Sequence, residues 1–137
     1  MTQKGARRRP RWRKEQNRPL SKGPTPGGAG RGLIHIWGQL PITKSGVPDN
    51  QSASFDSQAK LVLDNFLAIL DAAGAKRQDV LKVTAYIVSA ENWPKFNRIF
   101  IDAFGDHRPS RSVVPVPELH HGYLIEIDGV ALDPAAR

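Results

Sequence analysis

The sequence predicts one α+β domain, in which two amphipathic helices cover one face of a mixed β-sheet. Three observations support this. The chain of 137 residues is long enough for a single core of ordinary size. Two segments repeat apolar residues at steps of three and four, which is the helical period. Runs rich in β-branched residues lie before, between and after these segments, so the expected order is strand, helix, strand, helix and two strands.

The first strand is expected at residues 33–37, which form a short apolar, β-branched run. The first helix is expected at residues 55–73, where a single apolar stripe continues over five turns. Ser52 or Ser54 can cap its start, and Gly74 suits the left-handed position just after its end. This segment is the most strongly helical part of the chain.

The second half of the domain repeats this pattern. A strand is expected at residues 80–88 and a second helix at residues 92–104, with Pro94 tolerated only in the first helical turn. Two further strands are expected at residues 111–116 and 123–132. Because both helices pack on one sheet face, the other face is bare in a monomer. The pattern therefore predicts an oligomer that buries this face.

The positive charge of the protein is confined to an N-terminal arm. The overall net charge is +7, but residues 1–32 contain ten Lys or Arg and one acid, and the rest of the chain has a net charge of −2. We therefore divide the sequence into a basic arm rich in Arg, Pro and Gly (residues 1–31) and a mildly acidic domain (residues 32–134). The arm is interpreted as a solvated tail, with a weak contact to nucleic acid or another polyanion as the alternative.

Several classes of chemistry lack support in the sequence. There is no cysteine, no phosphate-binding loop, no serine-hydrolase elbow and no apolar run near the ~20 residues that span a bilayer. We predict no metal, no cofactor and no membrane contact, and a cytoplasmic location. His120 and His121 are adjacent in a turn, which favours a surface or a pocket rim over a metal site. His35, inside an apolar strand, is predicted to be packed and hydrogen-bonded.

Two charged residues stand among β-branched neighbours in the expected strands. Arg111 precedes Ser112-Val113-Val114, and Glu126 lies between Ile125 and Ile127. A charge in such surroundings is paired, exposed on a solvated face, or retained for function. From the pattern alone, a structural salt bridge is the more common outcome.

The motifs of the domain resemble those of the RidA/YjgF family of reactive-intermediate deaminases. The resemblance covers about residues 32–133, and several short segments carry it in order and spacing. These segments are Gly38-Gln39-Leu40-Pro41-Ile42, Asn65, Ala72-Ala73-Gly74-Ala75, Asp79-Val80-Leu81-Lys82-Val83-Thr84, Phe96-Asn97, Pro109-Ser110-Arg111-Ser112 and Ile125-Glu126-Ile127.

This resemblance implies a chorismate-mutase-like fold, a homotrimer with pockets between subunits, and hydrolysis of enamines and imines such as 2-aminoacrylate and 2-iminopropanoate. No cofactor is implied. Arg111 would bind the substrate carboxylate, and Glu126 would orient or activate the attacking water. Asn97 and the backbone around Gly38 and Val113 would line the pocket.

The sequence departs from the family pattern at three places. Trp37 stands where the family commonly has Ser or Thr, Val113 where it has Cys, and Gly23-Pro24-Thr25 where it has Gly-Pro-Tyr. Trp37 could stack over a larger substrate, narrow the pocket or pack into the core. The alternatives to a deaminase are therefore a non-catalytic protein that binds a small carboxylate at Arg111, and a nucleic-acid or anionic-surface contact made by the arm.

Overall fold

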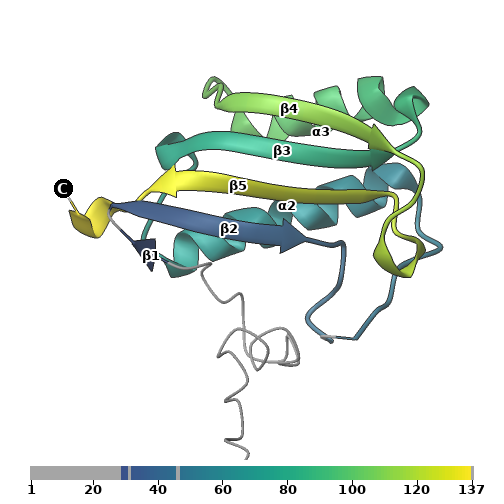
Figure 1. Ribbon diagram of the computed structural model, residues 1–137, viewed down its shortest axis with the longest axis horizontal. Coiled ribbons are helices and arrows are strands. Elements are labelled where there is room, and N and C mark those ends of the chain that lie inside the picture. The colour runs from purple at the N-terminus through teal and green to yellow at the C-terminus, as the bar shows by residue number, and fades with distance from the viewer. Residues whose placement is uncertain (1–28, 31, 46, 137) are drawn as a thin grey trace, which may run out of the picture.

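A computed structural model of the chain describes residues 29–30, 32–45 and 47–136. One five-stranded sheet has the order β1-β2-β5-β3-β4. β3 and β4 are parallel, whereas the other neighbouring strands are antiparallel. Helices α2 and α3 lie on one face of this sheet (Figure 1), which confirms the predicted α+β architecture. The bounds are β1 Ala29–Gly30, β2 Leu33–Gln39, α2 Phe55–Ala72, β3 Val80–Val88, α3 Trp93–Phe104, β4 Ser110–Val116 and β5 Ile125–Leu132.

The helix ends follow local chemistry. The Ser54 side chain accepts a hydrogen bond from the Ser57 N–H at 3.2 Å and caps α2. Gly74 follows the helix with φ +74°, and Gly105 ends α3 with φ +61° and ψ −129°, so both have a positive φ that glycine adopts without steric cost. Pro94 lies in the first turn of α3, where its missing N–H breaks no helical bond.

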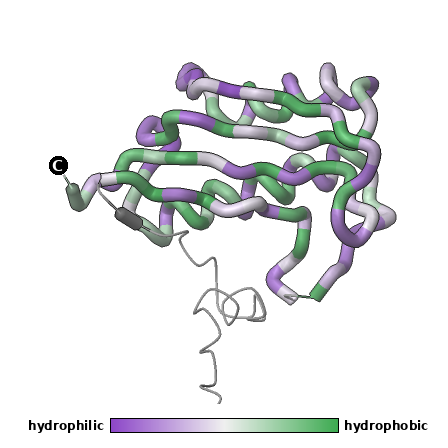
Figure 2. Tube along the Cα trace, viewed as in Figure 1, coloured by the Kyte–Doolittle hydropathy of each residue, from purple (hydrophilic) through white to green (hydrophobic). Residues whose placement is uncertain are grey.

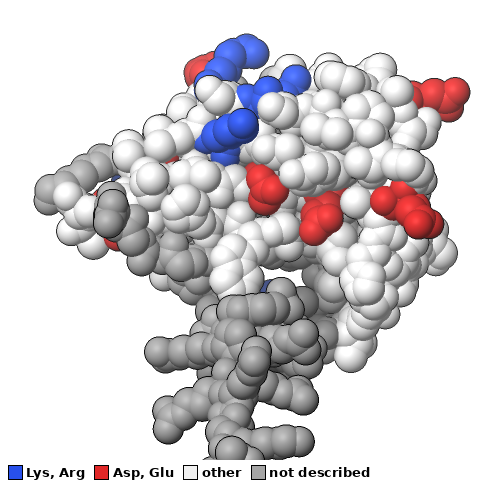
Figure 3. Space-filling view, viewed as in Figure 1, with Lys and Arg blue, Asp and Glu red and all other residues white. Residues whose placement is uncertain are grey.

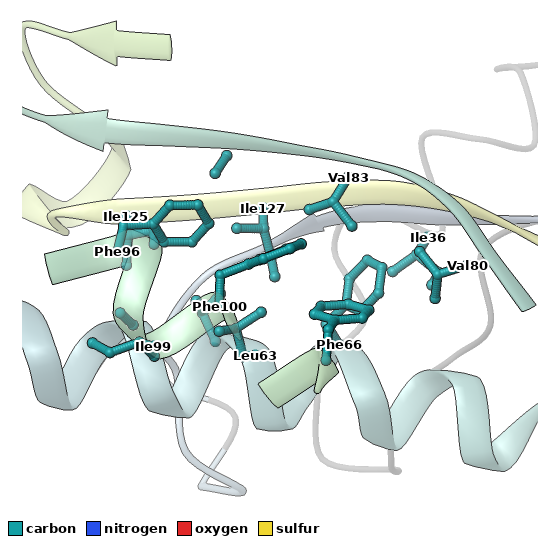
Figure 4. Close-up of a cluster of buried hydrophobic side chains, with 14 of the residues drawn as sticks. Ile36, Leu63, Phe66, Val80, Val83, Phe96, Ile99, Phe100, Ile125 and Ile127 are labelled. Carbon is teal, nitrogen blue, oxygen red and sulfur yellow. The ribbon is translucent and has the colours of Figure 1, made fainter. Parts of the chain in front are cut away.

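The core lies between the sheet and the two helices (Figure 4). Alternate residues of each strand enter it because strand side chains point to opposite faces in turn, and this alternation is visible along the strands in Figure 2. On β3 and β5 the core positions are Val83, Ala85, Ile87, Ile125 and Ile127, all fully buried. Phenylalanines from both helices fill the space above them.

Among the described residues, no helix covers the opposite face of the sheet (Figure 1). His35 is exposed on this face, because it alternates with the buried Ile34 and Ile36 of β2. The prediction of a packed, hydrogen-bonded His35 is therefore wrong. Strand alternation, rather than the apolar character of its neighbours, decides its environment.

Two long-range contacts fix the loop that joins β2 to α2. Asn65 on α2 donates hydrogen bonds to the carbonyl oxygens of Leu40 and Ile42, at 3.2 and 3.0 Å. The buried Tyr123 hydroxyl donates to the Asp49 carbonyl at 2.6 Å and accepts from the Asp49 N–H at 3.0 Å. These bonds tie the loop that follows β2 to α2 and to Tyr123.

The predicted basic arm, residues 1–31, lies outside the described residues except for β1, which adds an antiparallel edge to β2. Within the described part of the chain, no helix combines the length and hydropathy needed to cross a bilayer.

Candidate functional site

Arg111 lies on the helix-covered side of the edge strand β4. It pairs in register with Val83, whose side chain is fully buried beneath the helices. The guanidinium carbon is 4.9 Å from the centroid of the Phe100 ring and 5.6 Å from that of Phe96. Among the described residues, the Arg111 guanidinium makes no hydrogen bond or ion pair, so it does not form the structural salt bridge that its sequence context also allowed. Arg111 is exposed, although partial desolvation lowers the pKa of its guanidinium, and the group stays cationic at neutral pH.

Asn97 shares a cavity with Arg111. The cavity has a volume of about 300 Å³ and lies between α3 and the start of β4. The Asn97 Oδ1 atom is buried and has no hydrogen-bond partner among the described residues. Val113, half-buried two residues after Arg111 on β4, pairs with the buried Ala85 and points to the same side of the sheet. This cluster offers a cationic fork beside an unused acceptor, which suits a carboxylate ligand carrying an N–H donor.

Glu126 lies on the uncovered face of the sheet. It stands opposite Tyr86 in the antiparallel β3–β5 register, and its neighbours Ile125 and Ile127 point into the core on the other face. The pKa of Glu126 is raised, mainly because the carboxyl is half-buried and further because of the nearby Asp128 charge; His120 opposes the shift. A carboxyl of this kind can exchange a proton nearer neutral pH than an exposed one.

The β2 backbone lies against Glu126. A Cβ added at Gly38 would overlap the Glu126 Oε1 atom and stand 3.1 Å from its Cδ, so the carboxyl occupies the space that a larger residue would fill. Trp37 precedes Gly38 at the shift in register between β2 and β5, and is 54% exposed. This exposure excludes the core role that the sequence left open for Trp37. Stacking and pocket narrowing remain available to it.

The six residues singled out in the sequence thus form two clusters on opposite sides of one sheet. The Arg111 cluster consists of Arg111, Asn97 and Val113; the Glu126 cluster consists of Glu126, Gly38 and Trp37. Within one protomer, the Arg111 and Glu126 side chains point away from each other. A site using both groups requires a second copy of the chain.

The paired histidines form a surface feature, in agreement with the sequence analysis. His120 and His121 are exposed, and their ring centroids are 3.6 Å apart. The part of the chain that the structure describes contains no group of three or more side chains able to hold a metal ion.

Sequence reasoning missed the groups that surround these clusters. Phe100, Ile101 and Phe104 line the cavity beside Arg111, and helical spacing from Asn97 could have indicated Ile101. Asp128 lies two residues after Glu126, so strand alternation already placed both carboxyls on one face. The Tyr86 hydroxyl donates to the Asp128 Oδ2 atom at 3.4 Å, a contact between distant segments that only the fold reveals.

Comparison with known proteins agrees with this fold and these motifs. The model of the family described as Endoribonuclease L-PSP matches residues 25–133. A RutC family protein of Pyrococcus horikoshii is 37% identical over 100 residues, covering 72% of this chain and 78% of that protein. An Escherichia coli protein named 2-iminobutanoate/2-iminopropanoate deaminase is 34% identical over 123 residues, covering 85% of this chain and 93% of the relative.

A solved structure leads to the same family. The crystal structure of Escherichia coli TdcF with bound serine superposes with a TM-score of 0.66 at 28% identity, covering 80% of this chain and 93% of that one. The family model, the curated relatives and the shared fold agree with the motifs read from the sequence. The chain belongs to the RidA/YjgF family, which includes proteins named imine deaminases.

Proposed function

We propose that this protein is a hydrolytic deaminase of enamine and imine intermediates of the 2-aminoacrylate and 2-iminopropanoate type, which releases a 2-oxo acid and ammonia. The observation that carries the proposal is the pair of unpaired charged groups. Arg111 is exposed but packs against two phenylalanine rings, Glu126 is half-buried, and neither side chain forms an ion pair within the described residues. The relative named 2-iminobutanoate/2-iminopropanoate deaminase supports this assignment.

The Arg111 cluster binds the substrate in this proposal. The planar guanidinium of Arg111 donates two parallel hydrogen bonds to the substrate carboxylate. The Phe96 and Phe100 rings hold the guanidinium in place. The unused Asn97 Oδ1 atom accepts a hydrogen bond from the imine N–H. These contacts fix C2 of the substrate, the carbon that water attacks.

Glu126 moves the proton. Its carboxylate removes a proton from water while the oxygen forms a bond to C2, and the electron pair of the C=N bond moves to nitrogen. The nitrogen takes up this proton, which gives the carbinolamine. Its C2–N bond then breaks as the hydroxyl oxygen forms the C2 carbonyl, the hydroxyl proton passes to the nitrogen, and ammonia leaves. The sum is one imine and one water giving one 2-oxo acid and one ammonia, with no redox step.

A homotrimer would supply both clusters to each site. Side chains of Lys and Arg gather near the beginnings of β3 and β4 on the uncovered face, with an acidic side chain beside them, whereas the other visible Asp and Glu lie over its middle and opposite end (Figure 3). This separation favours a head-to-tail contact, in which the basic part of one copy meets the acidic part of the next. A closed ring of such contacts would bury Trp37 and Val114, which are 54% and 38% exposed. Sedimentation should then give about three times 15.1 kDa.

Mixed oligomers test the shared site directly. Arg111→Met removes the carboxylate fork, and Glu126→Gln removes the base but keeps a hydrogen-bond acceptor, so neither variant alone should hydrolyse an imine generated in situ. Co-expressed in equal amounts, the two variants should recover about a quarter of the wild-type ammonia release, because one interface in four joins an intact Arg111 to an intact Glu126.

The controls separate the possible outcomes. In mixtures of wild type with the Arg111→Met/Glu126→Gln double variant, the double variant contributes neither group. These mixtures therefore measure how the rate falls when intact subunits are diluted by inactive ones. Mixed single variants that stay inactive contradict the shared site. A wild-type trimer that binds 2-oxo acids but hydrolyses no imine contradicts the deaminase and supports the binding protein considered as the alternative.

A further inference from the structure

The cavity next to Arg111 is larger than a small imine requires. Its volume of about 300 Å³ lies at the lower end of the range for small-molecule sites. Arg111 and Asn97 occupy one part of its lining, and the exposed Ile101 together with the edges of the largely buried Phe100 and Phe104 provides its apolar wall. The methyl group of 2-iminopropanoate would contact only a small part of this wall.

The apolar wall is continuous with the proposed carboxylate site. Phe96, Phe100 and Phe104 follow each other at four-residue steps along α3, and their ring centroids are 5.6 and 4.5 Å apart. The guanidinium of Arg111 stands 4.9 Å from the centroid of the middle ring. A carboxylate bound to Arg111 would therefore have the Phe100–Phe104 wall within reach of the group attached to C2.

Ile101 is the second indication of an apolar occupant. Ile101 lines the cavity and is 48% exposed, whereas Ile99, the other isoleucine of α3, is buried in the core. An exposed isoleucine beside two stacked phenylalanines leaves apolar surface in water, which an apolar ligand group would cover. Arg108 also lines the cavity, but unlike Arg111 it packs against no aromatic ring of the described residues, and solvent around its exposed side chain weakens its attraction for a second negative charge.

From this geometry we propose that the cavity is a side-chain subsite, and that the protein prefers 2-imino acids with a large branched or aromatic apolar side chain over 2-iminopropanoate. The inference rests on the deaminase activity proposed above and specifies its substrate class. Each methylene buried on such a wall increases binding about fourfold. A four-carbon or aromatic side chain should therefore raise kcat/KM at least tenfold over a methyl group.

The test compares imines that an amino-acid oxidase generates in situ from alanine, 2-aminobutyrate, leucine, phenylalanine and glutamate. We expect kcat/KM for ammonia release by the full-length oligomer to increase from the alanine-derived to the leucine- and phenylalanine-derived imine. Ile101→Ser should reduce the ratio of leucine- to alanine-derived turnover at least threefold. Leu81→Ser changes an aliphatic residue of similar exposure, 42% against 48% for Ile101, that does not line the cavity, and should keep the wild-type ratio.

A second readout makes the two proposals distinguishable. Calorimetry with pyruvate, 4-methyl-2-oxopentanoate and phenylpyruvate measures the subsite without any chemistry. Tighter binding of the larger 2-oxo acids, together with no hydrolysis of any imine, would overturn the deaminase and keep the subsite. Hydrolysis that is fastest for the alanine- or glutamate-derived imine would overturn the apolar subsite and keep the deaminase. An Ile101→Ser variant with the wild-type ratio of leucine- to alanine-derived turnover would have the same meaning.

Discussion

The Glu126 carboxyl lies directly above the Cα of Gly38, in the space that a side chain at position 38 would occupy. The overlap involves only the far end of a flexible side chain, so Gly38→Ala can be relieved by rotating Glu126 away from its position. We expect ammonia release to fall at least tenfold because the base is misplaced, while the free energy of unfolding changes by less than about 1 kcal/mol.

Gly129→Ala is the matched control for that variant. A Cβ at Gly129 would stand 2.6 Å from the Lys82 carbonyl oxygen and 2.7 Å from the Phe66 ring, neither of which can move freely. Chemical denaturation should therefore show a loss of about 1–3 kcal/mol in this variant. Equal stability losses in both variants would contradict a positional role for Gly38.

Arg111→Lys tests the fork geometry while keeping the charge. Lysine cannot present two parallel donors, so turnover and 2-oxo acid binding should both fall more than tenfold. The loss of one charge-assisted contact of about 1.5–3 kcal/mol is enough for this effect. Arg98→Lys, at an exposed position of α3 outside the cavity, should bind and react like wild type. If Arg111→Lys does the same, the proposed carboxylate site is wrong.

The pH dependence of turnover should report on Glu126. Its pKa is raised above the ordinary 4.5, and the reaction needs the ionised form, so the acid limb of kcat/KM should lie above pH 4.5. Asp128→Asn removes a like charge, which lowers the pKa of Glu126 and should move this limb to lower pH. His120→Asn removes an opposing charge and should move it to higher pH.

Asp102→Asn, on the exposed side of α3, controls for the overall change in charge and should leave the limb in place. Initial rates measured between pH 4 and 8 on folded protein distinguish these cases. An identical limb in wild type and Asp128→Asn would show that Glu126 does not supply the titrating group.

Tyr123 should contribute strongly to stability. Its buried hydroxyl satisfies both backbone groups of Asp49, and Tyr123→Phe leaves them unpaired, at a cost of about 1–3 kcal/mol in the free energy of unfolding. The pKa of Tyr123 is raised above 10.0, chiefly by burial. The stability it provides is therefore complete below pH 10 and lost as the pH rises through the folded-state pKa. Tyr86→Phe, which loses only a 3.4 Å bond on the uncovered face, should be milder.

Removal of residues 1–28 should leave the melting temperature nearly unchanged, because this segment has little apolar surface and carries much of the positive charge. The truncation keeps β1, which pairs with β2. Any salt-sensitive binding to a polyanion such as heparin should disappear. A large fall in the melting temperature would show that the arm packs on the domain.

The sequence by itself determined the elements of this protein, because local physics defines them. The apolar stripe, the capping Ser54 and the left-handed Gly74 indicate α2 without knowledge of the rest of the chain, and its observed end lies one residue from the predicted one. Short motifs around Arg111 and Glu126 were also sufficient to identify the family, since they depend on residue order alone.

Only the tertiary structure decided on which side of the sheet each group lies. The exposure of His35, the separation of Arg111 from Glu126 and the position of Gly38 beneath a carboxyl all depend on strand register, which pairs segments that lie far apart in the sequence. A one-residue change in register would reverse every one of these assignments. Register is fixed by packing of the whole sheet against α2 and α3, and no local pattern contains that information.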